Sequence, residues 1–374
     1  MLEAVFWICG ALIVYAHAGY PLVLRALVSL RRRPTLAPQT WEELPRVSLI
    51  VAAYDEEDVI AAKVANALAL DWPRERLEVI IASDGSADAT AERARAAGAD
   101  LVLDLPRGGK VAAQNAAAER ASGEILAFSD ANSAWAPDAL RRLVEPFADP
   151  EVGYACGQVR FTGPGGGNLE GAYWHYEMRV REMESALAGV TAGNGAIYAV
   201  RSAAYIPLPP SGSHDLSFPF ALAKRGLRSL YVPRARAEER MVPTLEGELA
   251  RKRRMMVGLW DIVVGEGMLR PRGYAPLYAF ELVSHRLLRY LTPLLHLVVV
   301  GTNVALLGQG WVYTATLALQ AALLLAAIVG RWIPIAPFRV ARYYALTTAS
   351  IALGLWDRAR HGAPGTWEKA EGTR

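Results

Sequence analysis

Apolar residues gather at the two ends of this chain, and a segment of mixed polarity separates them. Residues 4–24 contain no Asp, Glu, Lys or Arg, over a length close to the ~20 residues that cross a hydrocarbon core. Residues 290–330 also lack charged side chains, over about twice the length of a single span. Because Gly, Gln and Gly at residues 308–310 allow the chain to turn, the second segment predicts a helical hairpin.

Basic residues give the first apolar segment a predicted orientation. Arg25 and three arginines at residues 31–33 follow it. A signal peptide carries its basic residues before the apolar run and a small-residue cleavage site after it, a pattern that this segment does not have. We therefore expect residues 1–33 to form an uncleaved membrane anchor. The positive-inside rule then places the domain that follows in the cytoplasm.

The last apolar stretch, residues 343–356, allows two interpretations. It is shorter than the ~17 residues of the shortest spans, unless Arg339 and Arg342 extend their side chains to the membrane surface. A span here would put residues 358–374 outside, whereas the basic residues of that tail favour the inside. We predict a C-terminal transmembrane region over residues 290–357 and leave the side of the tail open.

Residues 274–290 combine aromatic and apolar side chains with His285, Arg286 and Arg289. This composition is typical of a helix that lies in the membrane interface, where basic groups reach lipid phosphates. We therefore predict an interfacial amphipathic helix over residues 268–289 that docks the preceding domain on the membrane. An ordinary helix packed on that domain would have a similar apolar face.

The middle of the chain, residues 45–265, alternates short apolar runs with alanine-rich helical patterns. The strand-like runs are residues 47–53, 77–83 and 124–129, and the helical patterns are residues 57–69, 87–97 and 111–121. The first two runs are each followed by a helical pattern, and two helical patterns come before the last run. This alternation predicts a Rossmann-like α/β domain with a mostly parallel sheet. Ligands of such sheets bind beyond the carboxyl ends of the strands.

Composition and motifs exclude several classes of function. The net charge is only +3, and the basic residues lie next to apolar segments, so a nucleic-acid partner is not expected. Cys9 and Cys156 fall in different predicted units and indicate neither a disulfide framework nor a zinc site. The first strand is followed by AAYDEE, without the glycine fingerprint of a nicotinamide dehydrogenase. The apolar segments contain too few polar groups for a transporter.

Polar residues follow the predicted strands at the edge where ligands would bind. Asp84 lies in a turn after a strand, and Lys110 follows two glycines at the head of a helix, an arrangement suited to a diphosphate. Asp130 and Asn132 present two side-chain oxygens that Mg²⁺ or Mn²⁺ could bridge to phosphate. The structural alternatives are a helix cap at Asp84, a solvated lysine, and an Asx turn at Asp130.

The order of these segments is more specific than any one of them. The chain reads VSLIVAAYDEE, IIASDGS, RGGK, FSDANS, GNGAIYAVRS, SHDLSFPF and RKRRM over residues 47–258. This order resembles the inverting family 2 glycosyltransferases of the GT-A fold, especially the membrane-embedded branch that includes hyaluronan, chitin, cellulose and poly-N-acetylglucosamine synthases. The resemblance implies a nucleotide-diphosphate sugar as donor, UDP as its carrier, and Mg²⁺ or Mn²⁺ as the metal.

The resemblance also implies roles for residues on the donor side. The nucleotide pocket would begin at Ala53, Tyr54 and Glu56, Asp84 would contact the base, Lys110 would approach the diphosphate, and Asp130 would anchor the metal. The family often has Asp at the third position of its acidic motif, where this chain has Asn132. An amide oxygen can ligate a hard cation but brings no charge.

On the acceptor side, the resemblance implies that Gly193, Asn194 and Gly195 let the backbone approach a sugar. Asp215 occupies the position of the general base, which must accept the proton of a sugar hydroxyl as the new bond forms. A capping role at the start of a helix is its structural alternative.

RKRRM resembles the family signature that ends in Trp. Arg251 and Arg254 lie three residues apart on a predicted helix, where both can face a departing diphosphate. Met255 replaces the tryptophan, and this favours limited transfer to a lipid-linked acceptor over long-chain synthesis.

These observations predict an integral membrane, inverting glycosyltransferase of cell-envelope polysaccharide biosynthesis. It would transfer a sugar from a nucleotide-diphosphate donor to a lipid-linked or polysaccharide acceptor, with Asp215 as the base. Two alternatives stay open. The chain could be a processive polysaccharide synthase, or a non-catalytic membrane scaffold that retains a nucleotide-sugar fold.

Overall fold

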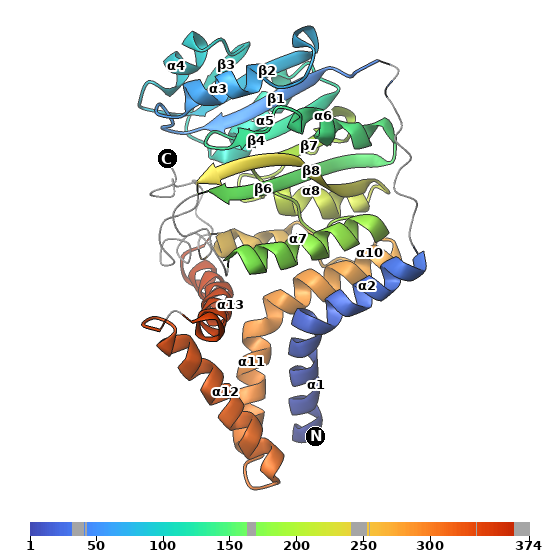
Figure 1. Ribbon diagram of the computed structural model, residues 1–374, viewed down its shortest axis with the longest axis vertical. Helices are drawn as coiled ribbons and strands as arrows, with labels where there is room; N and C mark the ends of the chain where they lie inside the picture. The colour runs from blue at the N-terminus through green and yellow to red at the C-terminus, as the bar shows by residue number, and fades with distance from the viewer. Residues whose placement is uncertain are drawn as a thin grey trace.

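A twisted sheet with helices on both faces lies above a layer of long helices in the computed structural model (Figure 1). Further helices extend from that layer, away from the sheet, and the N-terminus lies at their far end. The structure describes residues 1–31, 41, 43–162, 170–240, 253, 255–333 and 335–362.

The sheet has eight strands in the order β3-β2-β1-β4-β7-β6-β8-β5. Their bounds are β1 Val47–Ala53, β2 Leu77–Asp84, β3 Leu101–Leu105, β4 Ile125–Asp130, β5 Ala134–Trp135, β6 Val152–Thr162, β7 Ile197–Arg201 and β8 Arg228–Arg240. Strands β3, β2, β1 and β4 are parallel, as the alternating pattern predicts, and the three predicted strands are confirmed. Strand β7 runs antiparallel to β4 and β6, so the second half of the sheet is mixed.

Strand β1 explains why the sheet is covered on both faces. All seven of its residues are buried. Val47, Leu49 and Val51 pack into the core on one face, and Ile50 and Ala52 pack into the core on the other. A strand that is buried at every position, and apolar at all but Ser48, requires helices on both sides, which is typical of a parallel sheet.

Six helices of the α/β domain position the loops at the edge of the sheet. They are α3 Ile60–Leu68, α4 Thr90–Ala96, α5 Lys110–Arg120, α6 Ala139–Val144, α7 Glu170–Leu187 and α8 His214–Ala223. Helix α7 lies between the sheet and the layer of long helices (Figure 1).

Within the described residues, three helices are long and apolar enough to cross a membrane, namely Leu2–Leu30, Pro276–Ala305 and Trp311–Val329. The first comprises α1 Leu2–Val14, a π-helical turn Tyr15–Gly19, and α2 Tyr20–Arg31. The second comprises α10 Pro276–Glu281, the π-helical segment η6 Leu282–Leu287, and α11 Leu288–Ala305. The third is α12 Trp311–Val329, and a turn with Gly308 and Gly310 at positive φ joins it to α11. The predicted pair of helices with a glycine turn is therefore present.

Two of the long helices, Leu2–Leu30 and Pro276–Ala305, change direction along their length (Figure 1). Helices α2 and α10 run below α7, whereas α1 and α11 extend together away from the sheet (Figure 1). Two elements that are far apart in sequence thus bend in the same place, where the α/β domain meets the apolar helices.

The segment 274–290 packs on the α/β domain. Tyr278 and Glu281 are buried, and His285 has no exposed surface. The expectation that His285 and Arg289 reach lipid phosphates is wrong, because both pair with Glu177 on α7. Carboxylates of the protein already supply the opposite charge, and the alternative of an ordinary packed helix describes these side chains. Docking of the domain on a membrane stays a prediction.

The last helix, α13 Ala336–His361, is longer than the predicted stretch 343–356. It is not apolar enough to be among the candidate spans. In its last turns Asp357 pairs with Arg253, and Arg358 pairs with Asp261. This end of α13 therefore lies against residues near the C-terminal end of the predicted α/β domain.

Candidate active site

Three parallel strands end side by side at the edge that the sequence predicts as the binding edge. In the sheet register, Ala53 of β1 pairs with Ser83 of β2, and Ala52 pairs with Asp130 of β4. The loops after these strands therefore start next to one another. Tyr54, Asp84 and Asp130 all belong to this edge.

Asp84 holds the loop that precedes α5. Its buried carboxylate accepts hydrogen bonds from the backbone N–H of Gly108 (2.7 Å) and Gly109 (3.0 Å), and from Arg107 Nη1 (2.5 Å). Gly109 has φ +91°, a conformation that favours glycine. Asp84 does not cap the helix that follows it, since the residue before α4 is Ala89.

Arg107 adds a contact that sequence reasoning missed. Its guanidinium carbon lies 3.4 Å from the centre of the Tyr54 ring, a cation–π contact. Arg107 thus stacks on Tyr54 and pairs with Asp84 at the predicted nucleotide pocket. The signal in the sequence is the first residue of RGGK.

Glu56 is buried between two loops rather than displayed at the surface of the pocket. Its backbone N–H donates to Thr90 Oγ1 (2.8 Å). The preceding residue, Asp55, has φ +50° and accepts from the backbone N–H of Ala87 (2.9 Å). These bonds join the loop after β1 to the loop after β2.

Lys110, the first residue of α5, forms an ion pair with Asp130 at the end of β4. About a quarter of each side chain is exposed, 24% and 29% respectively. Burial opposes the charged amine, but the carboxylates of Asp130 and Asp215 raise the pKa of Lys110 above its ordinary value. Lys110 is therefore a cation at the centre of the site.

The predicted acceptor segment lies between Lys110 and Asp215. The backbone N–H of Gly193 donates to the backbone oxygen of Asp215 (2.6 Å). A Cβ on Gly193 would lie 1.8 Å from the hydroxyl of Tyr154, so only glycine fits there. A Cβ on Gly195 would lie 3.9 Å from Lys110 Nζ. Asn194 is held by a hydrogen bond to the backbone oxygen of Gly157 (3.4 Å).

Asp215 lies in the first turn of α8. Its carboxylate accepts a hydrogen bond from the hydroxyl of Ser213. The neighbouring His214 is buried and bonds to the Tyr198 hydroxyl through Nδ1 (2.7 Å). Burial and the charge of Lys110 lower the pKa of His214 to about 3, so it is a neutral core residue.

A buried lysine lies behind Asp130. Lys63 on α3 is 3% exposed and donates to the backbone oxygen of Ser133 (2.7 Å). Burial lowers the pKa of Lys63 to about 7, against the attraction of Asp130. Its signal in the sequence is its position on the apolar face of α3, next to Ile60, Val64 and Ala67.

The chemistry of the predicted metal ligands fits a hard cation. Asp130 offers a carboxylate and Asn132 an amide oxygen, and the remaining ligands of Mg²⁺ or Mn²⁺ are commonly phosphate and water. Within the described residues, no group of three His, Cys, Asp or Glu side chains could hold a metal by itself. Arg251 and Arg254 lie outside the described residues.

Comparisons with known proteins give a matching family and related sequences. Residues 48–206 match the family described as "Glycosyl transferase family 2". The beta-monoglucosyldiacylglycerol synthase of Synechocystis sp. is 33% identical over 170 residues, which cover 40% of this chain and 33% of that protein. An N-acetylglucosaminyltransferase of Rhizobium meliloti is 27% identical over 322 residues, which cover 76% of this chain and 75% of that protein. This chain thus matches about a third of the first relative's length.

Among solved structures, the mannosyltransferase PcManGT from Pyrobaculum calidifontis, in complex with GDP-Man and Mn²⁺, has a similar fold. The TM-score is 0.74 at 24% identity, and the match covers 96% of this chain and 99% of that one. This likeness confirms the predicted GT-A fold. The match also includes the helices below the sheet, because it covers 96% of this chain.

Proposed function

We propose, from the glycosyltransferase family 2 domain that this chain carries over residues 48–206, that it is an inverting glycosyltransferase. It moves a sugar from a nucleotide-diphosphate donor to a lipid-linked or polysaccharide acceptor at a membrane. One observation supports this function above the others. Lys110 pairs with Asp130 and is within electrostatic range of Asp215, at the edge where Asp84 and Tyr54 also lie.

Asp215 is the proposed general base. Its carboxylate accepts the proton of an acceptor hydroxyl while that oxygen attacks the anomeric carbon and the bond from this carbon to the diphosphate breaks. Attack opposite to the leaving group inverts the anomeric centre. The hydrogen bond from Ser213 orients the carboxylate before the reaction.

Lys110 has a proposed second partner during the reaction. Its ammonium pairs with Asp130 in the absence of donor, and a diphosphate at this edge would offer it a stronger negative charge. Asp130 and Asn132 would hold Mg²⁺ or Mn²⁺. When bound, the metal would neutralise the charge that develops on the departing diphosphate. Arg251 and Arg254 are proposed to face the same leaving group.

The donor is proposed to be a UDP-sugar, with Ala53, Tyr54 and Glu56 at the start of the nucleotide pocket and Asp84 as the contact of the base. Arg107 already stacks on Tyr54 and pairs with Asp84, so a base entering this pocket must stack on Arg107 or displace it. Since the mannosyltransferase of similar fold is described with GDP-Man and Mn²⁺, GDP-sugars belong in the same donor screen.

The acceptor is proposed to come from the membrane. Three helices of the described chain are long and apolar enough to span it, and the name of the Synechocystis relative includes a diacylglycerol product. The proposed units are a membrane anchor over residues 1–33, the GT-A domain over 45–265, an interfacial helix over 268–289, and a transmembrane region over 290–357. The GT-A domain is proposed to face the cytoplasm.

An Asp215→Asn variant tests the assignment. Parent and variant are reconstituted in phosphatidylcholine vesicles with UDP- and GDP-sugars, Mn²⁺ and a lipid extract, and release of nucleoside diphosphate is measured. Turnover should fall about 100-fold or more, whereas donor affinity, measured by calorimetry, should change less than about twofold. Equal turnover in both proteins would remove Asp215 as the base. Donor binding by the parent without turnover on any acceptor would favour the scaffold, and long products would favour a processive synthase.

A further inference from the structure

A cavity of about 890 Å³ lies between α1, α11, α12 and α13, on the side of the helical layer away from the sheet. In the described part of the chain, its walls contain no Asp, Glu, Lys or Arg. Its rim is apolar and open, because Trp7, Val14 and Leu319 are each at least half exposed. Since α1, α11 and α12 belong to the candidate spans, this cavity would open to lipid and not to water.

The length of the cavity suits a hydrocarbon chain as its occupant. Along α1 its lining runs from Phe6 to Ala18, which is about 18 Å at 1.5 Å per residue. One leaflet of a bilayer has a hydrocarbon depth of about 15 Å. A helix about 10–12 Å across would fill the volume within about two turns, so a transmembrane partner would not fit along this length.

The end of the cavity nearest the α/β domain carries polar groups. His296 Nε2 lies 2.7 Å from the hydroxyl of Tyr344, and both residues line the cavity. His17 lines it too, and the backbone oxygen of His17 accepts a hydrogen bond from Tyr176 on α7 (2.9 Å). Thr316 and Gln320 of α12 also line the cavity and bond to Asn303 nearer its far end. His17, His296 and Tyr344 are the polar lining residues at the end that meets the α/β domain, where a lipid would place its headgroup.

Helix α11 connects this polar end of the cavity to a residue that interacts with the proposed base. Tyr290 interacts electrostatically with Asp215 and lies on the same helix as His296. The two residues are six positions apart, or about 9 Å along the helix axis. The polar end of the cavity therefore lies about 9 Å along α11 from a residue that is within electrostatic range of Asp215.

We propose that this cavity binds the hydrocarbon chain of the lipid acceptor and directs its headgroup hydroxyl toward Asp215. The inference rests on the proposed transfer reaction and names the acceptor class for it, a lipid with a free hydroxyl. A bulk phospholipid in the same place is the competing occupant, and the experiment separates the two.

The chain offers a matched pair of glycines for this test. A Cβ on Gly10 meets nothing within 4 Å, and Gly10 lines the cavity. A Cβ on Gly301 also meets nothing within 4 Å, but this glycine lies on the exposed face of α11, outside the lining. Gly10→Leu places a side chain in the cavity and narrows it, whereas Gly301→Leu does not, and both make the same change in helix propensity. Ala11→Leu is a second filling variant.

The full-length proteins are reconstituted in phosphatidylcholine vesicles with a diacylglycerol that carries a diazirine near the end of one chain. A phosphatidylcholine with the same photoreactive chain serves as the bulk-lipid probe. After irradiation, adducts are mapped by mass spectrometry. The diacylglycerol should label lining residues of α1 and α12 more than the phosphatidylcholine does. Labelling should fall at least about fivefold in Gly10→Leu and Ala11→Leu, because overpacking typically costs 1 kcal/mol or more, and should persist in Gly301→Leu.

Equal labelling by the two probes, or unchanged labelling in both filling variants, would overturn the proposal. Labelling needs no turnover, so Asp215→Asn is examined in parallel and should label like the parent. Transfer to diacylglycerol that survives in Gly10→Leu would reject the cavity and keep the proposed function. Selective labelling of the cavity without transfer to any acceptor would reject the proposed function instead.

Discussion

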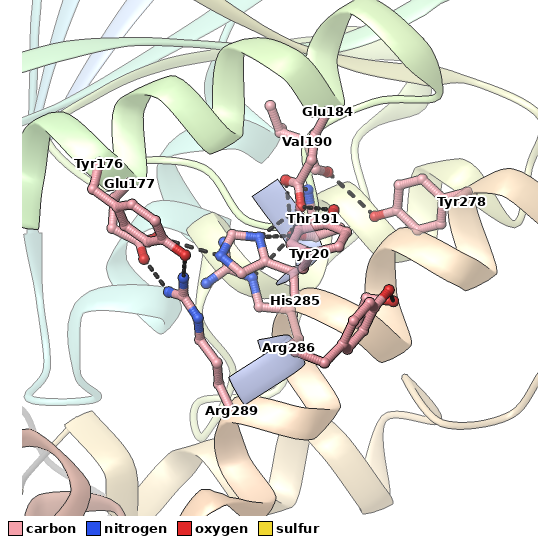
Figure 2. A network of polar contacts seen from close by, with 12 residues as sticks. Tyr20, Tyr176, Glu177, Glu184, Val190, Thr191, Tyr278, His285, Arg286 and Arg289 are labelled. Atoms are coloured by element: carbon pink, nitrogen blue, oxygen red, sulfur yellow. Dashed lines mark hydrogen bonds and ion pairs between the residues drawn. The ribbon is translucent and has the colours of Figure 1, made fainter. Parts of the chain in front are cut away.

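Two clusters in this molecule use the same residue types in different surroundings. At the edge of the sheet, Lys110 pairs with Asp130 in a site where about a quarter of each side chain is exposed. Below α7, Arg289 pairs with Glu177, and their side chains are 10% and 8% exposed. We call the second cluster the buried network (Figure 2), and define it by Tyr20, Tyr176, Glu177, Glu184, Thr191, His285, Arg286 and Arg289.

The buried network joins three segments that are far apart in the sequence. Glu184 on α7 accepts from the Tyr20 hydroxyl of α2 (2.8 Å) and lies 2.6 Å from His285 Nδ1 of η6. Arg286 donates to Thr191 Oγ1 (3.0 Å). Burial acts to raise the pKa of Glu177, but Arg289 and His285 hold it well below its usual range. The network therefore fixes both bent helices to the catalytic domain.

The difference between the clusters lies in whether a charge can exchange its partner. Lys110 and Asp130 remain in contact with solvent, so a diphosphate and a metal ion can take the place of each partner. Arg289 and Glu177 have no such access, and separating them would leave a charge buried without compensation. The first pair suits a reaction, and the second suits the mechanical link between the catalytic domain and the apolar helices.

The largest effect is expected at the exchangeable pair. Asp130→Ala should lower transfer about 1,000-fold, equivalent to about 4 kcal/mol, because the site would lose its proposed charged metal ligand. In a titration with Mn²⁺ followed by electron paramagnetic resonance, with nucleotide present, Asp130→Ala should bind Mn²⁺ more weakly than the parent does. Asn132→Asp is the matched variant, and it should retain activity and bind Mn²⁺ more tightly. Full transfer by Asp130→Ala in the presence of a chelator would reject the metal assignment.

A smaller effect, on stability instead of catalysis, is expected at the buried network. Arg289→Met should lower the free energy of unfolding by about 3 kcal/mol, because it leaves Glu177 buried without its guanidinium partner. Arg141→Met, which breaks the exposed pair with Asp71, should lower the melting temperature much less. Thermal melting in detergent compares them. Adding Glu177→Gln should restore part of the loss, and equal melting of Arg289→Met and the parent would contradict the link described here.

The sequence predicts this molecule best where a pattern is local. Alternating strands and helices identify the parallel half of the sheet, and the residue after each strand identifies the edge with Asp84 and Asp130. The buried network could not be predicted, because its members come from residues 20, 177–191 and 285–289. The composition of 274–290 is the same for a helix on lipid and a helix on protein. Only the carboxylates on α7 decide between them.

The smallest expected effect concerns Lys63, which belongs to neither cluster completely, since it is buried like Arg289 but faces Asp130 of the site. Burial lowers its pKa from 10.5 to about 7. Between these values the unfolded chain binds a proton at this amine and the folded chain does not, so the parent's free energy of unfolding rises with pH. From pH 7 to pH 8 the rise should be about 1 kcal/mol. Lys63→Met should lose this contribution, and thermal melting of both proteins at the two pH values measures it. If the difference in free energy of unfolding between parent and variant were the same at pH 7 and pH 8, Lys63 would be charged in the folded protein. Asp130 would then hold it, as part of the cluster that contains Lys110.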